Sequence, residues 1–421
     1  MRILHITPDY HPAMGGGELY IREISERLAS RGHDVVVLTM NSRSLAGRNG
    51  ERLPAREIVG QVRVNRLNST YKVHERLLSV RGAHRALSLA FSAEKSRMLA
   101  SSPCSLRAFL FTLRAQADVV GVVNWYHGSL AYQTAIARDL SNFAFVGIPL
   151  FHTERPWAHF PLMAQMLDRC DAVAVMTEHE QRFVEHGSAQ RNTHVVGAGV
   201  EPTLFSRADG RQIRSRYGVG DRPIVGYVGR MSATKGVVTL IQAMQIVWRS
   251  EPRARLLLAG SGLPSSQKCE DDIRRAFARL SDAERSRIVS VSTFTDDEKA
   301  SIFDALDVFA MPSVAESFGI AYLEAWMRER AVIGSRIGAT GCVIRDGVDG
   351  MLVKPEDPEE LATTIIRLLA NRDLRERMGH AGHVKSVASF TWEKVADRVE
   401  QTYRSACAAK TAWQRRAGAV A

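Results

Sequence analysis

The chain has 421 residues, of which 45% are apolar and 24% are charged, and its formal net charge is +11. This length indicates two or three domains whose cores need no disulfide or metal, and the composition excludes a collagen-like chain, a disordered chain and a disulfide-rich miniprotein. The cysteines are widely spaced and form no Cys-x-x-Cys pair, which favours reduced thiols over a disulfide framework or a zinc site: Cys104, Cys170, Cys269, Cys342 and Cys407.

The N-terminal segment reads as a short buried strand and lacks the apolar stretch of a signal peptide. No apolar run approaches the roughly 20 residues that span a bilayer. We therefore expect a soluble or peripheral protein in the cytoplasm.

Positive charge is concentrated in two segments. Residues 60–117 hold ten lysines and arginines against two glutamates, a net +8, and residues 402–421 hold four basic residues and no acidic one. A localised basic face predicts an anionic partner such as nucleic acid, anionic lipid or an acidic saccharide, and the alternative is a solvated surface.

Strands and helices alternate along the first part of the chain. An apolar strand over residues 2–7 is followed by a glycine-rich turn and a helix over 19–30, with Leu19, Ile24 and Leu28 at helical spacing. Further continuous apolar runs, typical of parallel strands buried on both faces, lie at 35–39, 119–123, 145–150 and 172–176. Residues 68–116 interrupt this series as one or two amphipathic basic helices, whose buried side would hold Leu77, Val80, Leu87 and Phe91.

The pattern restarts after a polar, glycine-containing stretch. A strand at 224–228 and a helix near 236–249 are followed by strands at 255–259, 288–291, 308–311 and 331–335. Two series of βα units predict an α/β protein with two Rossmann-like domains, each a parallel sheet covered by helices on both faces. We place the first domain at 1–202, a linker at 203–222, the second domain at 223–390, and a helix with a basic tail at 391–421.

Gly15-Gly16-Gly17-Glu18 follows the first strand and opens a helix. Glycines there let the backbone approach a ligand closely, and the helix N-terminus offers N–H groups to an anion. The spacing is not GxGxxG and no acidic residue ends the second strand, so a dinucleotide cofactor is disfavoured. The alternative is a tight turn without a ligand.

Two cations, Arg230 and Lys235, follow the first strand of the second domain within Gly-Arg-Met-Ser-Ala-Thr-Lys-Gly. Open α/β sheets bind phosphates at the carboxyl ends of their strands, where arginine offers a planar fork and lysine a point charge. The pair could therefore neutralise a diphosphate without a metal. The alternative is two solvated charges in a loop.

The strongest motif runs from Pro312 to Ala325 and contains Glu316 and Glu324. It follows an apolar strand, so Glu316 should lie in the loop, and a helix beginning near 317–319 would carry Glu324 about two turns inside. Backbone amides around residues 318–320 could then bind phosphate oxygens, and the two carboxylates could accept hydrogen bonds from a diol. The alternative is a pair of surface carboxylates.

Together these motifs resemble the retaining glycosyltransferases of group one, family four, whose two Rossmann-like domains face each other across a cleft in the GT-B fold. The resemblance covers nearly the whole chain and is strongest over 223–400. It rests on the motifs above, on Leu-Leu-Leu-Ala-Gly-Ser-Gly at 256–262 and on the segment 347–362. The final helix, from Trp392, is similar to the one that crosses back onto the first domain in this family.

The resemblance implies roles for individual residues. Arg230 and Lys235 would hold the donor diphosphate and stabilise its charge as it leaves, which accelerates transfer because that charge grows in the transition state. Glu324 would bind the nucleotide ribose hydroxyls and Glu316 the transferred sugar. The remaining donor-binding candidates are glycines and one backbone segment, namely Gly15, Gly16 and Gly17 on the opposing wall of the cleft and Gly260, Phe318 and Gly319 on the donor side.

The family also places a functional histidine in the first domain. His127 and His152 both follow predicted strands and are the two candidates. The usual His-x-His segment after the strand that begins at Asp118 is not intact, because Val122 and Val123 stand there. A lone histidine at a strand end can equally be a hydrogen-bonded structural residue.

We therefore expect sugar transfer from a nucleotide-sugar donor to an acceptor hydroxyl, with retention of anomeric configuration. No metal is expected, since Arg230 and Lys235 already supply two positive charges to the diphosphate. The acceptor would be a saccharide, a lipid-linked molecule or a small molecule, and it would approach through the first domain.

Two alternatives remain open: a nucleotide-sugar epimerase of the same fold, and a non-catalytic basic binding protein. The two glutamates downstream of the Arg/Lys pair favour the transferase. The chain has no signature of a nucleic-acid-binding module, so no nucleic acid is expected as a partner. The basic segment 68–116 is a candidate for contact with the anionic inner face of a membrane, and the alternative is that its helices pack on the sheet.

Overall fold

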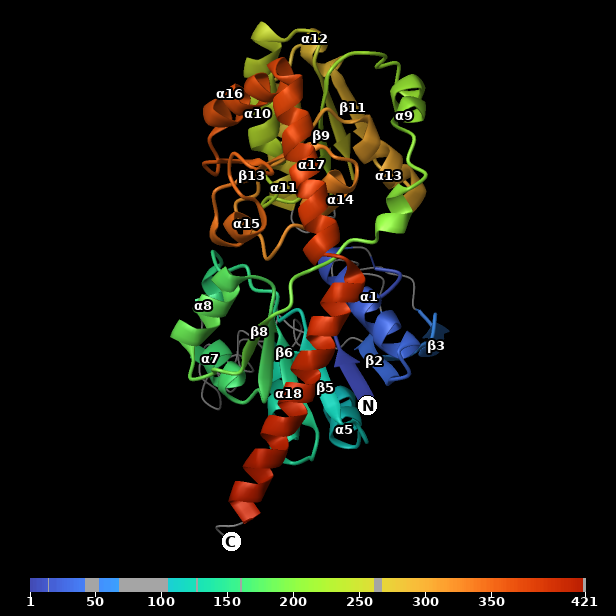
Figure 1. The fold of residues 1–421 in the computed structure, drawn as a ribbon, viewed down its shortest axis with the longest axis vertical. Helices are drawn as coiled ribbons and strands as arrows, with labels where there is room; N and C mark the ends of the chain where they lie inside the picture. Colours follow the sequence, from blue (N-terminus) through green and yellow to red (C-terminus); the bar gives the residue numbers. More distant parts are fainter. Residues whose placement is uncertain are drawn as a thin grey trace, which may run out of the picture. The chain divides into compact units, whose positions relative to one another are not determined.

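The computed structural model describes residues 1–13, 15–41, 53–67, 105–125, 128–159, 161–260 and 267–418. The chain forms two compact units, which are drawn in Figure 1. Unit 1 comprises Met1–Gly197 and Glu393–Ala421, and unit 2 comprises Ala198–Trp392. Each unit is a largely parallel sheet between layers of helices, as predicted.

Among the described residues, the sheet of unit 1 has eight strands in the order β3-β4-β2-β1-β5-β6-β7-β8. Neighbouring strands run parallel, except that β3 is antiparallel to β4. The central strands are mostly apolar because both of their faces are covered. The strands are β1 (Arg2–Ile6), β2 (Asp34–Met40), β3 (Arg56–Val59), β4 (Val62–Leu67), β5 (Val119–Val123), β6 (Ala144–Ile148), β7 (Ala172–Val175) and β8 (Thr193–Val195).

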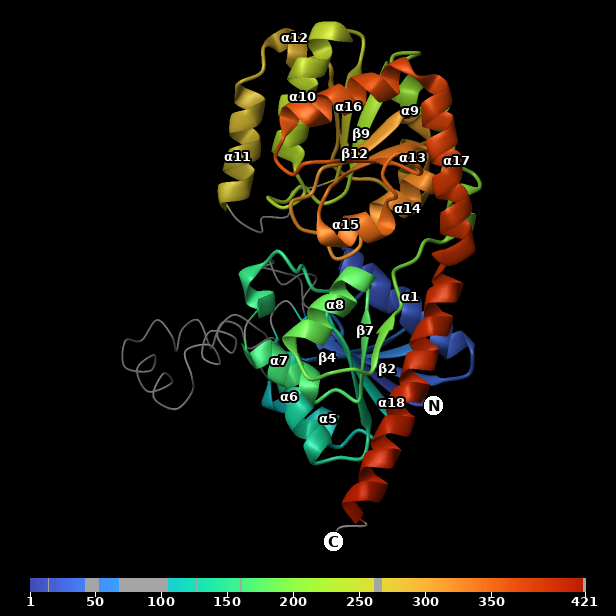
Figure 2. The same cartoon turned by 60° about the vertical axis from the view of Figure 1, so that its left-hand side comes forward.

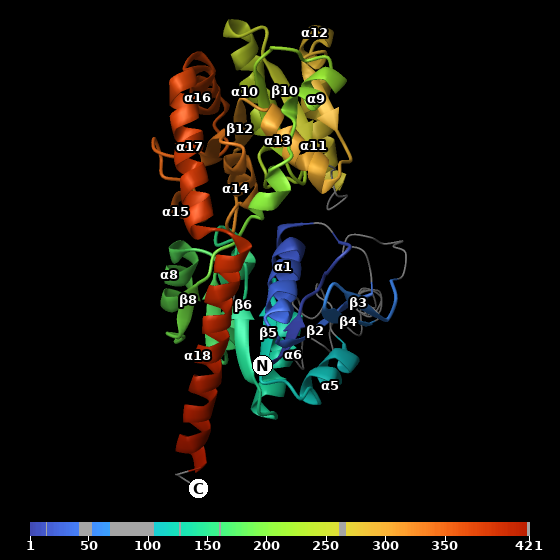
Figure 3. The same cartoon turned by 45° about the vertical axis from the view of Figure 1, so that its right-hand side comes forward.

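Side chains of β1 point alternately to the two faces of this sheet. Leu4 and Ile6 pack in a buried apolar cluster with residues of α5, α6, α7 and α8. His5 instead contacts Ser25 of α1 and Tyr403 of α18. Figures 2 and 3 show the same division, with α1 and α18 on one side of the strands and α5 and α6 on the other. The helices are α1 (Gly16–Ser30), α5 (Leu106–Leu113), α6 (Ser129–Asp139), α7 (Pro161–Asp168), α8 (Glu178–Gly187) and α18 (Trp392–Gly418), with a short 3₁₀ helix η1 (Pro156–His159).

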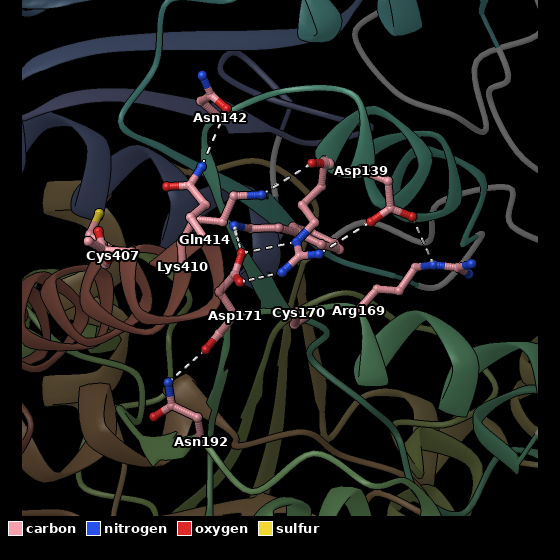
Figure 4. Close-up of polar contacts among 12 residues, drawn as sticks. Asp139, Asn142, Arg169, Cys170, Asp171, Asn192, Cys407, Lys410 and Gln414 are labelled. Carbon is pink, nitrogen blue, oxygen red and sulfur yellow. Dashed lines mark hydrogen bonds and ion pairs between the residues drawn. The ribbon is translucent and has the colours of Figure 1, made fainter. Parts of the chain in front are cut away.

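Helix α18 is fixed to unit 1 at its far end by a buried lysine. The Lys410 ammonium donates to the carbonyl oxygens of Arg138 at 3.3 Å and Ser141 at 3.4 Å, at the C-terminal end of α6. One turn further on, Gln414 donates to the Asn142 side chain at 3.4 Å (Figure 4). Lys410 therefore caps carbonyl groups that a helix leaves unpaired at its end, and it does not contribute an exposed charge to the basic tail.

In the described part of unit 2, the sheet has six parallel strands in the order β11-β10-β9-β12-β13-β14. They are β9 (Ile224–Val228), β10 (Arg255–Ala259), β11 (Ile288–Val291), β12 (Val308–Met311), β13 (Ala331–Ser335) and β14 (Met351–Val353). The predicted strands at 224–228, 255–259, 288–291, 308–311 and 331–335 have these same bounds. A continuous apolar run between polar turns marks both ends of a strand buried on two faces.

Helices cover both faces of the unit 2 sheet. On one face, α10 (Val237–Ser250) and α16 (Pro358–Ala370) pack on β12. On the other, α13 (Asp296–Ala305), α14 (Ile320–Met327) and α17 (Arg372–Ser389) pack on β9 and β13, and Figure 2 shows the two sets on opposite sides of the strands. The other helices of this unit are α9 (Gly210–Arg216), α11 (Gln267–Ala278), α12 (Asp282–Arg285) and α15 (Gly338–Val343), with η2 (Pro202–Phe205).

The structure differs from the predicted linker at 203–222. This stretch contains most of η2 and all of α9, and both elements pack on α13 inside unit 2. Asp209 caps α9 by accepting from the Arg211 N–H, and the Gly210 N–H donates to the Asp304 carboxylate at 2.8 Å. These local hydrogen bonds order a polar stretch that composition alone marks as a connection. The chain passes between the units at residues 197–198 and 392–393 instead.

Most of the basic segment 68–116 lies outside the described residues, including the predicted buried positions Leu77, Val80, Leu87 and Phe91. Its described end forms α5, whose first turn is capped by Ser105, because the Ser105 hydroxyl accepts from the Ala108 N–H at 3.3 Å. Within the described part of the chain, no helix is both long enough and apolar enough to cross a bilayer.

Candidate active site

Two loops meet at the carboxyl ends of the neighbouring strands β9 and β12 in unit 2. The first runs over residues 229–236 and the second over residues 312–319. The Val314 N–H donates to the carbonyl oxygen of Thr234 at 2.8 Å, so the two loops share a backbone hydrogen bond. Parallel strands place their carboxyl ends at one sheet edge, which is where open α/β sheets bind ligands.

Glycines allow this close approach of the loops. Gly236, the N-cap of α10, has a φ of +71°, and a Cβ added there would lie 2.0 Å from the carbonyl oxygen of Pro312. Gly260 has a φ of +130°, and its Cβ would lie 2.0 Å from the carbonyl oxygen of Gly229. The predicted site glycine Gly260 therefore lets the ends of β9 and β10 come together.

The structure brings Lys235 and Glu316 together as an ion pair between the two loops. Glu316 is 6% exposed, and a buried carboxylate is stable only when it is paired or hydrogen-bonded. Arg230, five residues before Lys235, is exposed, and its side chain makes no hydrogen bond or ion pair with the described residues. One predicted cation is thus already neutralised and the other is available to an anion.

Phe318 and Gly319 immediately precede α14. The Phe318 ring is buried against Phe390, with ring centres 5.5 Å apart. Gly319 has a φ of +96° and forms the N-cap of α14. The helix begins at Ile320, slightly later than the predicted 317–319, because Gly319 leaves the helical conformation. Glu324 is consequently a little more than one turn inside α14, and the predicted two turns are wrong.

Two side chains that the sequence did not point to lie around these motifs, and one of them pairs with Glu324. Tyr322 lies fully buried beneath Gly319 and donates to the Met311 carbonyl oxygen at 2.8 Å; its burial, together with the charge of Glu316, raises the pKa of the phenol. Lys299 of α13 lies 2.5 Å from the Oε1 atom of Glu324. No sequence spacing connects residues 299 and 324, since they meet only through the packing of α13 on α14.

In unit 1, the glycine turn begins α1, with Gly15 as its N-cap and Gly16 as its first residue. Gly15 has an extended φ of 169°, so this turn is unstrained. A Cβ added to Gly17 would lie 3.4 Å from Leu150 and 3.5 Å from the amide nitrogen of Asn124. The turn therefore packs against residues just beyond the carboxyl ends of β5 and β6.

Asn124 and Leu150 both have left-handed backbone conformations, with φ values of +60° and +54°. Such conformations are uncommon for residues other than glycine and often occur at functional sites. The Asn124 side chain makes no hydrogen bond with any residue that the structure describes. Sequence reasoning missed Asn124 because it considered only histidines at these strand ends.

Of the two candidate histidines, His127 lies outside the described residues. His152 is half-buried in the loop after β6, and this loop is anchored by a buried carboxylate. Glu180 of α8 accepts from the Phe151 N–H at 2.7 Å and from the Met176 N–H at 2.6 Å. Burial raises the pKa of Glu180 to about 7, against the effect of these two N–H groups.

The two halves of the chain match two family models. Residues 222–371 match the model described as glycosyl transferases group 1, and residues 15–199 match the glycosyl transferase 4-like domain. Together the two matches span most of the chain, one in each unit.

Two curated relatives match over nearly their whole length. A D-inositol 3-phosphate glycosyltransferase of Corynebacterium urealyticum is 28% identical over 417 residues, covering 93% of this chain and 91% of the relative. The enzyme of the same name from Corynebacterium glutamicum is 26% identical and covers 96% of each chain.

Solved structures share the fold. Sucrose-phosphate synthase from Thermosynechococcus elongatus has a TM-score of 0.75 at 23% identity, covering 97% of this chain and 100% of that one. Anabaena HepE in complex with UDP-glucose has a TM-score of 0.72 at 19% identity, covering 96% and 100%. At these identities the likeness shows the fold alone. With a matching family model in each unit, the chain belongs to the group 1 glycosyltransferases and has the GT-B fold.

Proposed function

We propose that the protein transfers a sugar from a nucleoside-diphosphate donor to an acceptor hydroxyl, with retention of anomeric configuration and without a metal ion. The observation that carries this proposal is the contact between Lys235 and Glu316 at the carboxyl edge of the unit 2 sheet. It unites a phosphate-binding cation with a sugar-binding carboxylate, next to the start of α14.

Each part of the donor then has a partner of suitable chemistry. Arg230 and Lys235 bind the diphosphate, and their charge stabilises it increasingly as the bond to the sugar breaks. Glu316 accepts hydrogen bonds from hydroxyls of the transferred sugar, and the backbone amides at Phe318 and Gly319 lie beside it. Glu324 accepts hydrogen bonds from the ribose diol.

Retention follows if the acceptor oxygen enters from the face that the diphosphate leaves. The bond between the anomeric carbon and the diphosphate oxygen breaks, and the bond to the acceptor oxygen forms on that same face. The proton of the acceptor hydroxyl passes to the departing diphosphate oxygen. The two cations take the place that a divalent ion has in metal-dependent transfer. Arg230 is available to the diphosphate, and the Lys235 ammonium, which has three donor positions, contacts the diphosphate while it also contacts Glu316. His152 and Asn124 are the described polar residues of unit 1 that we assign to the acceptor.

The first test is thermal stabilisation by a panel of UDP-, GDP- and ADP-sugars, since a donor that binds only the native state raises its stability. UDP-glucose belongs in this panel because HepE was solved with it. We expect one base to stabilise the wild type, and the Glu324→Ala variant to lose this effect. No stabilisation by any of the three bases would contradict the proposal.

The second test is transfer itself. Candidate acceptors should include D-inositol 3-phosphate, because this compound appears in the names of the two relatives. Saccharides and lipid-linked acceptors should be tested beside it. The anomeric configuration of the product, read by NMR, should equal that of the donor. Conversion of the donor sugar in the absence of any acceptor would instead indicate an epimerase.

A further inference from the structure

The only charged residue of α14 is buried. The helix reads Ile-Ala-Tyr-Leu-Glu-Ala-Trp-Met, and Glu324 within it is 8% exposed. Burying an ionised carboxylate is costly unless a cation or hydrogen-bond donors accompany it. A partner for Glu324 is therefore required even before a nucleotide binds.

Lys299 is that partner. Its ammonium lies 2.5 Å from the Oε1 atom of Glu324, and the two side chains are 22% and 11% exposed. Lys299 belongs to α13, which packs directly on α14, so both ends of the contact stand on helices. A rotation of the carboxylate away from its place would break this contact.

The pairing leaves part of the carboxylate available to a ligand. An ionised carboxylate has two oxygens with about four acceptor positions. One ammonium on Oε1 leaves Oε2 and a second position on Oε1 for other donors. Two neighbouring hydroxyls, such as the 2′ and 3′ hydroxyls of a ribose, supply two such donors.

We propose that Lys299 is a positioning residue that sets the selection for ribose at Glu324. This inference rests on the proposed function, in which Glu324 binds the ribose diol. Lys299 holds the carboxylate so that both hydroxyls reach it together. A nucleotide that lacks the 2′ hydroxyl then leaves a buried carboxylate oxygen without its donor, and such sites reject the analogue strongly.

The test compares the binding of ribose and 2′-deoxyribose nucleotides. The probes are the three pairs UDP and dUDP, GDP and dGDP, and ADP and dADP, measured by titration calorimetry. A hydrogen bond to a charged group is worth about tenfold in affinity or more, so the wild type should prefer the ribose form of its own base by at least that factor. Lys299→Met should reduce the preference to about twofold or threefold, and Lys299→Arg should restore most of it.

Matched variants separate this inference from the proposed function. Lys354→Met removes an exposed lysine of the same unit and should keep the full preference. Glu324→Gln should lose the preference, because an amide cannot accept from the diol with both of its polar atoms. Melting curves of all variants establish that they fold.

Three outcomes overturn the inference in distinguishable ways. If Glu324→Gln loses the preference while folded Lys299→Met keeps it in full, Lys299 has no part in ribose selection and the proposed function stands. If the wild type binds a ribose nucleotide and its deoxy analogue equally, the role of Glu324 fails and the inference fails with it. A uniform loss of affinity for both forms in Lys299→Met would likewise contradict positioning and indicate a general effect of charge.

Discussion

His5 of β1 and Tyr403 of α18 share a hydrogen bond of 2.7 Å between Nε2 and the phenolic oxygen, although 398 residues separate them. The second ring nitrogen of His5 lies 2.7 Å from the Ser25 hydroxyl. All three side chains are fully buried, and burial lowers the pKa of His5 to about 3. His5 is thus a neutral histidine that ties α18 and α1 to the central strand of unit 1.

Because of His5, the free energy of unfolding should decrease in mild acid. The unfolded chain takes up a proton at His5 below about pH 6.5, whereas the folded protein does not until about pH 3, so stability decreases as the pH falls through this window. We expect the wild type to lose about 2 kcal/mol more than His5→Gln between pH 7 and pH 5. Urea unfolding of both proteins at the two pH values measures the difference.

The difference between the wild type and His5→Gln cancels what the other titrating groups contribute to the pH dependence of stability. Glu180 acts with the opposite sign, because its raised pKa favours the folded state at low pH, but it is present in both proteins and cancels. His186→Gln, changed at an exposed position of α8, serves as the control and should follow the wild type. Equal pH dependence of the wild type and His5→Gln would show that His5 does not titrate in this way.

Removing the Lys235 side chain should lower kcat. Charge on the diphosphate grows as the bond breaks, so Lys235→Ala loses a contact that is strongest in the transition state. We expect a loss of about 3 kcal/mol, or roughly a hundredfold in kcat. Glu324→Ala should instead raise the KM for the donor. The matched control is Lys354→Ala at an exposed position of unit 2, and wild-type kinetics for folded Lys235→Ala would refute the site assignment.

Chelation should leave transfer unchanged. Arg230 and Lys235 supply the positive charge for the diphosphate, so we expect the same rate with and without EDTA in a dialysed enzyme. Restoration of a lost rate by Mg²⁺ or Mn²⁺ would contradict metal independence. The assay is initial-rate transfer with the donor that stabilises the protein.

The Asn124→Gly variant should show whether the left-handed backbone conformation at residue 124 serves function. Glycine adopts this conformation without strain, so Asn124→Gly should leave the free energy of unfolding unchanged or raise it by up to about 1 kcal/mol. If the free amide contacts the acceptor, the same variant lowers kcat/KM. Glu356→Gly relieves a similar φ of +57° at an exposed position of unit 2 and should keep full activity. Unaltered kinetics of Asn124→Gly would remove this residue from the site.

The strands of unit 2 were predictable because each is a continuous apolar run between polar turns. The antiparallel hairpin β3–β4 was not, since β4 breaks the alternation of apolar and polar residues at Asn65 and Arg66, and its arginines count toward a basic segment. In the structure Arg66 is buried and pairs with Glu57 on β3. From composition alone, such an arginine is counted as a surface charge. Its partner Glu57 is found only when the pairing of β3 with β4 is known.

For the site, the sequence indicated which residues line the edge of the unit 2 sheet but not how they pair. The motifs predicted Lys235, Glu316 and Glu324 as site residues, because the ends of strands and the starts of helices can be located from local sequence patterns. Lys299 and Tyr322 could not be found that way, since their contacts depend on how helices pack on one another. Asn124 was missed because its distinguishing property is a backbone angle.

The placement of α18 gives unit 1 an unusual order of assembly. Its strands are synthesised first, yet the side chains that cover His5 and cap α6 belong to residues 403 and 410. During synthesis the N-terminal region can form its strands, the helices of one face and α1 on the other, and the face that carries α1 is completed only when α18 has been made. The unit whose strands emerge first from the ribosome is therefore the one that is completed last.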